Sequence, residues 1–222
     1  MISDPPSKTA VLLGFLAALT LVAPGRTQGA PSAPSALTVP TGPLCASVEQ
    51  AATVRDAMAG KPPMPLAAVA ARVGMPESVV ASALPPAQAH GIAPTHFATV
   101  WKSLERWDNA VALVMHGPDV IEIEGPVGIG KPSTRSKFFN LERRGGGIAG
   151  HLRPDLYTAI YALDIPGKDG GGLYGVSFLD ASGAAVFSVF VPGEGAPPTE
   201  SALRQFRETA ALMRALPGLC PR

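Results

Sequence analysis

The spacing of apolar residues changes along this chain, and it predicts helices first, then strands, then a last helix. Residues 46–58 have the pattern of a helix with Ser47 as its N-cap. The apolar residues of 66–73 recur at i, i+3, i+4 and i+7, which is the spacing of one helix face. Gly74 predicts the end of that helix, and residues 76–84 predict another that starts with proline.

A fourth helix is expected over 95–108, and from Asn109 onward the apolar period changes from helical spacing to two. The strands expected from this alternation cover 110–116, 119–124, 137–141, 148–153, 156–165, 173–179 and 185–191. A closing helix is predicted over 198–216. Helices, then an antiparallel meander, then a C-terminal helix indicate the α+β class, because a parallel sheet needs strands and helices in alternation.

The first 44 residues differ from the rest. Residues 10–23 form an uncharged apolar run that is too short for a membrane span of about 20 residues and suits the hydrophobic region of a signal peptide. Asp4 and the single basic residue before the run, Lys8, are atypical of a signal peptide, so an over-extended start is the alternative. In both cases residues 1–44 are expected to be a signal-like or disordered leader before one domain over 45–222.

Composition excludes several partners. Apolar residues make up 46% of the chain and charged residues 16%, with a net charge of +1, so strong attraction to nucleic acid or to an anionic membrane is not expected. The two helices over 66–84 have a helix–turn–helix outline, but residues 76–84 contain no Arg, Lys, Asn or Gln to read bases. We therefore expect no nucleic-acid partner, and no stable membrane insertion once the leader is removed.

Motifs for common catalytic chemistry are missing from the sequence. It has no Gly-x-Ser-x-Gly nucleophile motif, and no Gly-Lys-Ser/Thr follows the three glycines at 145–147. Its two cysteines, Cys45 and Cys220, cannot form a CxxCH motif or a zinc site. Covalent c-type haem, iron–sulfur clusters and structural zinc are thereby excluded.

Two of the four histidines have a setting that favours ligand binding. His116 ends an apolar strand, and His151 lies among small residues that leave room for a flat ligand, as an axial haem ligand requires. An ordinary core or surface histidine is the alternative for each. His90 and His96 lie in a proline-rich connection and are expected to be exposed.

Basic residues cluster around the same strands as His151, against a nearly neutral background. They could hold an anion such as a pair of haem propionates, and a solvated basic face is the alternative reading. These residues are Arg135, Lys137, Arg143, Arg144 and Arg153.

Several short runs together resemble one protein family. They are Phe-Phe-Asn-Leu at 138–141, Gly-Ile-Ala-Gly-His-Leu at 147–152, Val-Ser-Phe-Leu-Asp-Ala-Ser-Gly at 176–183 and Val-Phe-Ser-Val-Phe at 186–190, with the helices at 66–73 and 97–109. In this order they resemble the HutX/ChuX family of intracellular haem-utilisation carriers. The resemblance covers about residues 47–216. This family is similar to one half of the tandem HemS/ChuS haem proteins.

The resemblance implies non-covalent b-type haem, a homodimer and a set of haem contacts. His151 and His116 match the proposed iron-contacting histidines of the family, and Arg135 matches a basic position before the Phe-Asn-Leu strand. Ser133, Thr134 and Ser136 stand where the family often has histidines, so the loop contacts to haem are expected to differ. Tyr157 and Tyr161 are the next candidates for the iron ligand.

The function implied is an intracellular carrier, not itself an enzyme, that delivers haem to a haem-degrading enzyme. The alternatives are a haem-degrading enzyme of the HemS/ChuS type and a binding module for a different ligand. The resemblance favours the cytoplasm, where both thiols would be free. If residues 1–30 act as a signal peptide, the location is periplasmic and Cys45 should be bonded to Cys220.

Overall fold

A computed structural model describes residues 44–116, 119–167, 171–193 and 197–220 of the chain. The expected leader, apart from residue 44, lies outside these residues, as do residues 117–118 between the strands expected at 110–116 and 119–124. The boundary between leader and domain therefore stays a prediction.

Three short helices open the described chain, as the sequence predicts. They are α1 (Val48–Met58), α2 (Leu66–Val73) and α3 (Glu77–Ala83). Ser47 caps α1, since its Oγ accepts a hydrogen bond from the Gln50 amide while the Gln50 side chain accepts one from the Ser47 amide. Gly74 ends α2 in the left-handed region with φ of 65°, a conformation that glycine adopts without steric cost.

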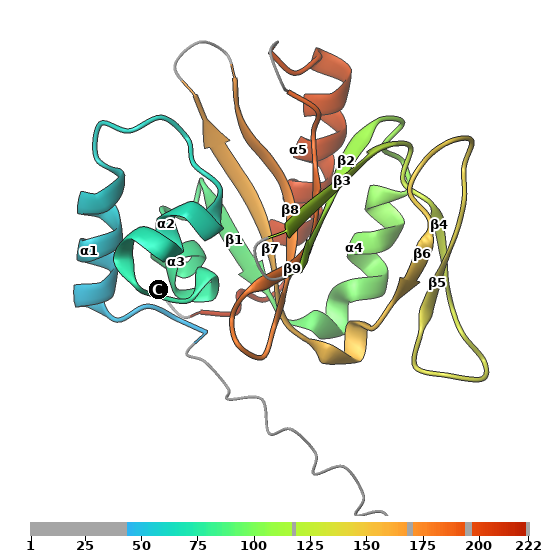
Figure 1. Ribbon diagram of the computed structural model, residues 1–222, viewed down its shortest axis with the longest axis horizontal. Coiled ribbons are helices and arrows are strands. Elements are labelled where there is room, and N and C mark those ends of the chain that lie inside the picture. Colours follow the sequence, from blue (N-terminus) through green and yellow to red (C-terminus); the bar gives the residue numbers. More distant parts are fainter. Residues whose placement is uncertain (1–43, 117–118, 168–170, 194–196, 221–222) are drawn as a thin grey trace, which may run out of the picture. The chain divides into compact units, whose positions relative to one another are not determined.

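The strands form two antiparallel sheets, and this confirms the α+β class. The larger sheet has the order β1 (Ala89–Ile92), β7 (Tyr157–Pro166), β8 (Gly172–Asp180), β9 (Ala185–Phe190), β2 (Ala110–His116) and β3 (Asp119–Gly125). The smaller one has the order β4 (Ile129–Pro132), β5 (Phe139–Glu142) and β6 (Gly150–Leu152). The strands are thus not one continuous meander, because β9 returns beside β2 and the three strands between β3 and β7 form their own sheet (Figure 1).

The alternation of side chains along β7 divides the core in two. Ile160 and Ala162 face a cluster shared with the C-terminal part of the fold, while Tyr161 and Leu163 face the opposite side and pack against α1–α3. Successive strand residues point to opposite faces, so one strand with both faces buried supports both clusters. This explains why β7 reads as an almost continuous apolar run.

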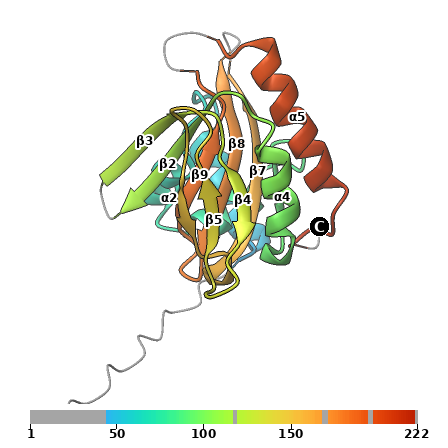
Figure 2. The ribbon, with the colours of Figure 1, turned by 90° about the vertical axis from the view of Figure 1, so that its right-hand side faces the viewer.

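Two helices cover the other face of the larger sheet. They are α4 (Phe97–Leu104) and α5 (Glu200–Arg214), and both lie on the same side of the sheet (Figure 2). The α4 helix is shorter than the predicted 95–108, because a 3₁₀ turn at Pro94–His96 precedes it and the chain leaves the helix after Leu104.

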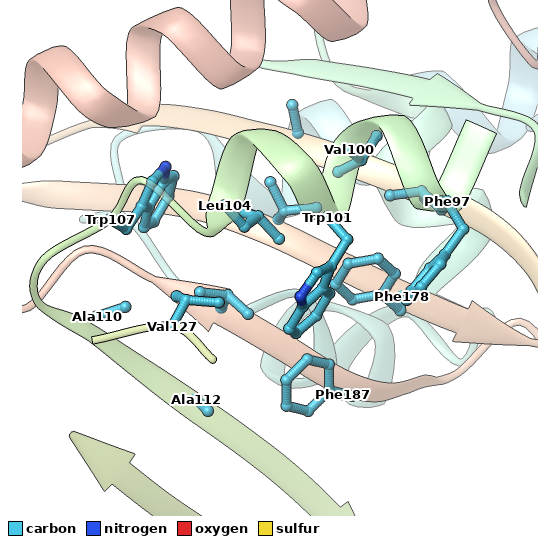
Figure 3. Close-up of a cluster of buried hydrophobic side chains, with 14 of the residues drawn as sticks. Phe97, Val100, Trp101, Leu104, Trp107, Ala110, Ala112, Val127, Phe178 and Phe187 are labelled. Atoms are coloured by element: carbon cyan, nitrogen blue, oxygen red, sulfur yellow. The ribbon is translucent and has the colours of Figure 1, made fainter. Parts of the chain in front are cut away.

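Trp101 of α4 joins the two sheets. Its ring lies 6.2 Å from that of Phe178 and 6.1 Å from that of Phe187 on the larger sheet, and 6.1 Å from that of Phe139 on the smaller one (Figure 3). Its Nε1 donates a hydrogen bond to the Gly128 carbonyl at 3.1 Å. The smaller sheet is therefore attached to the domain through its inner, aromatic face.

The exposure expected for His90 and His96 is wrong. His90 is half-buried, because it belongs to β1, a strand that the sequence pattern does not show, and His96 is half-buried at the start of α4. Of the two alternatives given for the cysteines, the structure has the bonded one: Cys45 and Cys220 form a disulfide with a Cα–Cα distance of 5.7 Å. The bond ties the start of α1 to a C-terminal segment that pairs with β1 through Gly218 and Ile92.

In the described part of the chain, no single helix combines the length and hydropathy of a membrane span. Only α2 and α3 taken together reach these limits, and they are bent by 102° relative to each other.

Candidate functional site

His151 lies on the outer face of the smaller sheet. It is on β6, directly opposite Asn140 of β5. Phe139 and Leu141 flank Asn140 and are buried, so Asn140 and His151 point the other way, and the imidazole is exposed. Of the strands of this sheet, β4 and β5 face the viewer in Figure 2. A ligand can therefore reach His151 from solvent.

The imidazole of His151 is held by Asn140. The Asn140 Oδ1 lies 2.8 Å from His151 Nδ1. A carbonyl oxygen only accepts hydrogen bonds, so this contact favours the tautomer that carries its proton on Nδ1. In that tautomer Nε2 carries no proton, which is the form that binds a metal.

An aromatic and charged cluster adjoins the imidazole. The Phe138 ring meets the His151 ring edge-to-face at 5.8 Å, and the Arg153 guanidinium lies 5.6 Å from the centre of the Phe138 ring. Arg153 donates two hydrogen bonds to Asp155, at 2.7 and 2.9 Å, and Lys137 lies 3.6 Å from the same carboxylate. The hydrogen bonds from Arg153, with help from Lys137, lower the pKa of Asp155 to about 2.

The predicted basic cluster divides into two groups. Arg153 lies over the Phe138 ring that contacts His151, Lys137 lies near Asp155, and Arg135 is exposed in the loop that leads from β4 to β5. Arg143 donates to the Gly147 carbonyl and Arg144 to the Glu105 carbonyl, so these two serve the local structure. Only the first group offers cations toward a ligand on the outer face.

His116 lies on the other sheet. It ends β2, pairs with Asp119 of β3 and is exposed. Within the described residues no hydrogen bond or ring contact joins it to His151. One chain therefore does not bring the two predicted iron ligands into contact, and their roles stay predictions.

The two tyrosines named as next candidates are buried in the core. Tyr161 packs among α1–α3, and Tyr157 lies in the shared cluster next to Phe97 and Phe178. Burial raises the pKa of Tyr157 to about 12. A phenol buried in the core does not reach a ligand at the surface, so neither tyrosine fits the role of iron ligand.

A hollow of about 700 Å³ lies beside β2, β3 and β9, and its charge does not suit haem. Its walls are apolar, with Val111, Leu113 and Phe190 among them, but Glu122 and Glu124 also line it. Carboxylates repel propionates, whereas Arg135 and Lys137 attract them. The charge pattern therefore favours the His151 face. No group of three or more His, Cys, Asp or Glu side chains in the described ranges could hold a free metal ion.

The fold defines the class as an α+β domain, and a family model defines the family within that class. Residues 91–208 match the family described as "Haem utilisation ChuX/HutX". The chain belongs to this family, as its sequence runs predict. The sequence matches none of the curated proteins.

Solved structures share the fold at low sequence identity. The haem-binding protein ChuX is 22% identical with a TM-score of 0.61, and the match covers 74% of this chain and 99% of that one. Apo-PhuS, a haem-binding protein from Pseudomonas aeruginosa, is 18% identical with a TM-score of 0.60, and the match covers 83% of this chain and 52% of PhuS. The haem-degrading enzyme ChuS from Escherichia coli O157:H7 is 14% identical with a TM-score of 0.60, and the match covers 75% of this chain and 48% of ChuS.

Sequence reasoning missed the residues around His151. Asn140 and Phe138 stood in a run used only for the family resemblance, and their proximity to His151 depends on the β5–β6 register. Strand alternation alone predicts that the Asn140 side chain points away from the buried side of β5. It does not show which residue of β6 lies across from it.

Proposed function

We propose that this protein is a haem carrier that binds b-type haem non-covalently through His151 Nε2. The observation that carries the proposal is the hydrogen bond from His151 Nδ1 to Asn140, which leaves Nε2 ready for a metal on an exposed face. Arg135 and Lys137 supply positive charge for the propionates. His116 remains the candidate for a second iron ligand.

The openness of the site favours transfer over permanent retention. His151 is exposed on one face of a sheet, so a haem bound to it would be covered on one side only by this chain. A ligand with one side open to solvent can pass directly to an acceptor. We propose a haem-degrading enzyme as that acceptor.

Haem degradation by the chain itself is the second candidate. With a single histidine on an open face, the sixth iron position stays accessible, and oxygen activation needs such a position. Loss of the Soret band with ascorbate and recovery of a bilin product would support this second candidate. A haem spectrum that is stable under the same reductant supports the carrier.

We propose a homodimer as the working form. The β1 edge of the larger sheet is covered by the C-terminal segment, whereas β3 is an edge strand with Val120 and Ile121 more than half exposed. An uncovered edge strand offers unpaired backbone groups to a second copy. Sedimentation at about 10 μM protein, well above a nanomolar dissociation constant, should give twice the chain mass. A monomer mass there contradicts the proposal.

The disulfide supports an oxidising compartment for this chain, the alternative to the cytoplasm that the resemblance favours. Disulfides persist in the periplasm and outside the cell and are rare in the cytoplasm. We propose that the bonded form is the working one. Protein from the native host should have no free thiol and an N-terminus near residue 30, whereas two free thiols and an intact N-terminus would place it in the cytoplasm.

An absorbance titration with hemin tests haem binding itself. A saturable Soret shift at one haem per chain is the expected result. A spectrum identical to that of hemin in buffer would contradict the proposal and leave a binding module for another ligand.

A further inference from the structure

We infer that Asn140 is the positioning residue for His151: it fixes the proton on Nδ1 and so keeps Nε2 open toward the haem iron. The inference rests on the proposed function only for the identity of the ligand. The hydrogen bond of 2.8 Å from Nδ1 to Asn140 Oδ1 carries it.

The backbone on both sides of this contact is fixed. Asn140 lies between Phe139 and Leu141, which are 7% exposed each and anchor β5 in the aromatic core. The register of β5 with β6 then sets His151 directly across from Asn140. The core thus fixes the backbone that carries the Asn140 side chain, although the histidine that this side chain contacts is exposed.

A second restraint acts on the same ring. Phe138 contacts the imidazole by its edge and is itself covered by Arg153, which is held by two hydrogen bonds to Asp155. The imidazole is therefore restrained by an acceptor at Nδ1 and by an aromatic ring beside it.

The hydrogen-bond acceptor at Nδ1 also affects how strongly the His151 imidazole donates electrons to iron. A stronger acceptor there makes the imidazole a better electron donor to iron, and removing such an outer partner typically weakens metal binding about 10- to 100-fold. We expect the midpoint potential of bound haem to rise in Asn140→Leu and to fall in Asn140→Asp, which keeps an oxygen acceptor and adds charge.

The first arm of the test uses the apo protein. The ¹⁵N shifts of the His151 ring at pH 8.5 report which nitrogen carries the proton. The wild type should show the Nδ1–H tautomer, and Asn140→Leu should shift His151 toward the mixture of a free imidazole. An Nε2–H tautomer in the wild type, or no change in Asn140→Leu, overturns the inference whatever the protein binds.

The second arm uses hemin. Asn140→Leu should bind about 10- to 100-fold more weakly with a raised potential, and Asn140→Asp should recover the affinity. Asn109→Leu is the matched control, since Asn109 is exposed and its amide contacts Glu124. If the tautomer responds as expected but His151→Ala binds hemin like the wild type, the proposed function fails and the tautomer assignment stands. Equal midpoint potentials of bound haem in the wild type, Asn140→Leu and Asn140→Asp would overturn the claim that Asn140 affects electron donation from His151 to iron.

Discussion

The two faces of the smaller sheet differ in what their residues do. The inner face contributes Phe139 and Leu141 to the aromatic core around Trp101. The outer face carries the exposed His151 with Asn140 and Phe138. Because neighbouring residues on one strand face opposite ways, the inner side chains hold the backbone still while the outer ones remain free to meet a ligand.

The same contrast extends to charge. Glu77 is a buried carboxyl whose pKa is raised by loss of solvent, partly offset by a hydrogen bond from the Ala185 amide. Asp155, beside the outer face, is a carboxyl whose pKa is lowered by Arg153. Burial therefore disfavours the charged form of Glu77, whereas Arg153 on the outer side of the smaller sheet stabilises the charged form of Asp155.

The largest expected effect is on the inner side. Trp101→Ala removes a fully buried ring from the junction of the two sheets and leaves the Gly128 carbonyl without its indole donor. We expect a loss of about 3–5 kcal/mol in the free energy of unfolding. Urea unfolding measures it, and a change below 1 kcal/mol, within the range of surface substitutions, would show that Trp101 does not join the sheets as described.

The disulfide should give the next largest effect. Cys45→Ser with Cys220→Ser opens a covalent loop with a sequence separation of 175 residues. We expect a loss of about 2–5 kcal/mol, seen in thermal unfolding with and without reductant. Haem binding should be unchanged, because the bond lies at the helical end of the fold. Wild-type stability that is indifferent to reductant would mean that the bond does not form.

Glu77 allows a test that depends on pH. A carboxyl with a raised pKa in the folded state contributes most stability below its ordinary value of 4.5, and this contribution is lost as pH rises through the folded pKa. Glu77→Gln should lack this fall in stability, so its free energy of unfolding at pH 7 should match or exceed that of the wild type. Glu77→Ala should lose about 1–3 kcal/mol, because the Ala185 amide loses its acceptor. Parallel pH–stability curves for Gln and wild type would contradict the assignment.

The smallest stability effect is expected on the outer face. Phe138 is 41% exposed, so Phe138→Ala should change the free energy of unfolding by about 0.5 kcal/mol or less. Haem affinity should nevertheless fall, because the ring restrains His151. Chemical unfolding and a hemin titration of one preparation check both. A large loss of stability with unchanged haem affinity would assign Phe138 to the core instead.

Sequence reasoning recovers the elements whose pattern is strong. The capped α1, the glycine-ended α2 and the strands β7 to β9 follow from local spacing and turn residues. The short strands β1 and β4 do not, since four residues are too few for a period to emerge. The return of β9 to β2 is set by long-range pairing, which no local pattern records.

In the candidate site, too, sequence reasoning recovers local patterns and misses long-range pairing. The small residues around His151 are visible in the sequence, and they point to an open strand. The acceptor for Nδ1 comes from another strand through a register, and the separation of His151 from His116 results from the division into two sheets. Both depend on pairing between distant segments.

Haem titration of His151→Ala beside His116→Ala tests the central claim most directly. Both histidines are exposed and lie on strands, so each substitution should leave the fold intact. We predict that His151→Ala loses the wild-type Soret band and at least about tenfold in affinity, or 1.4 kcal/mol, while His116→Ala keeps the histidine-ligated spectrum. A His151→Ala protein with the spectrum and affinity of the wild type would contradict the account.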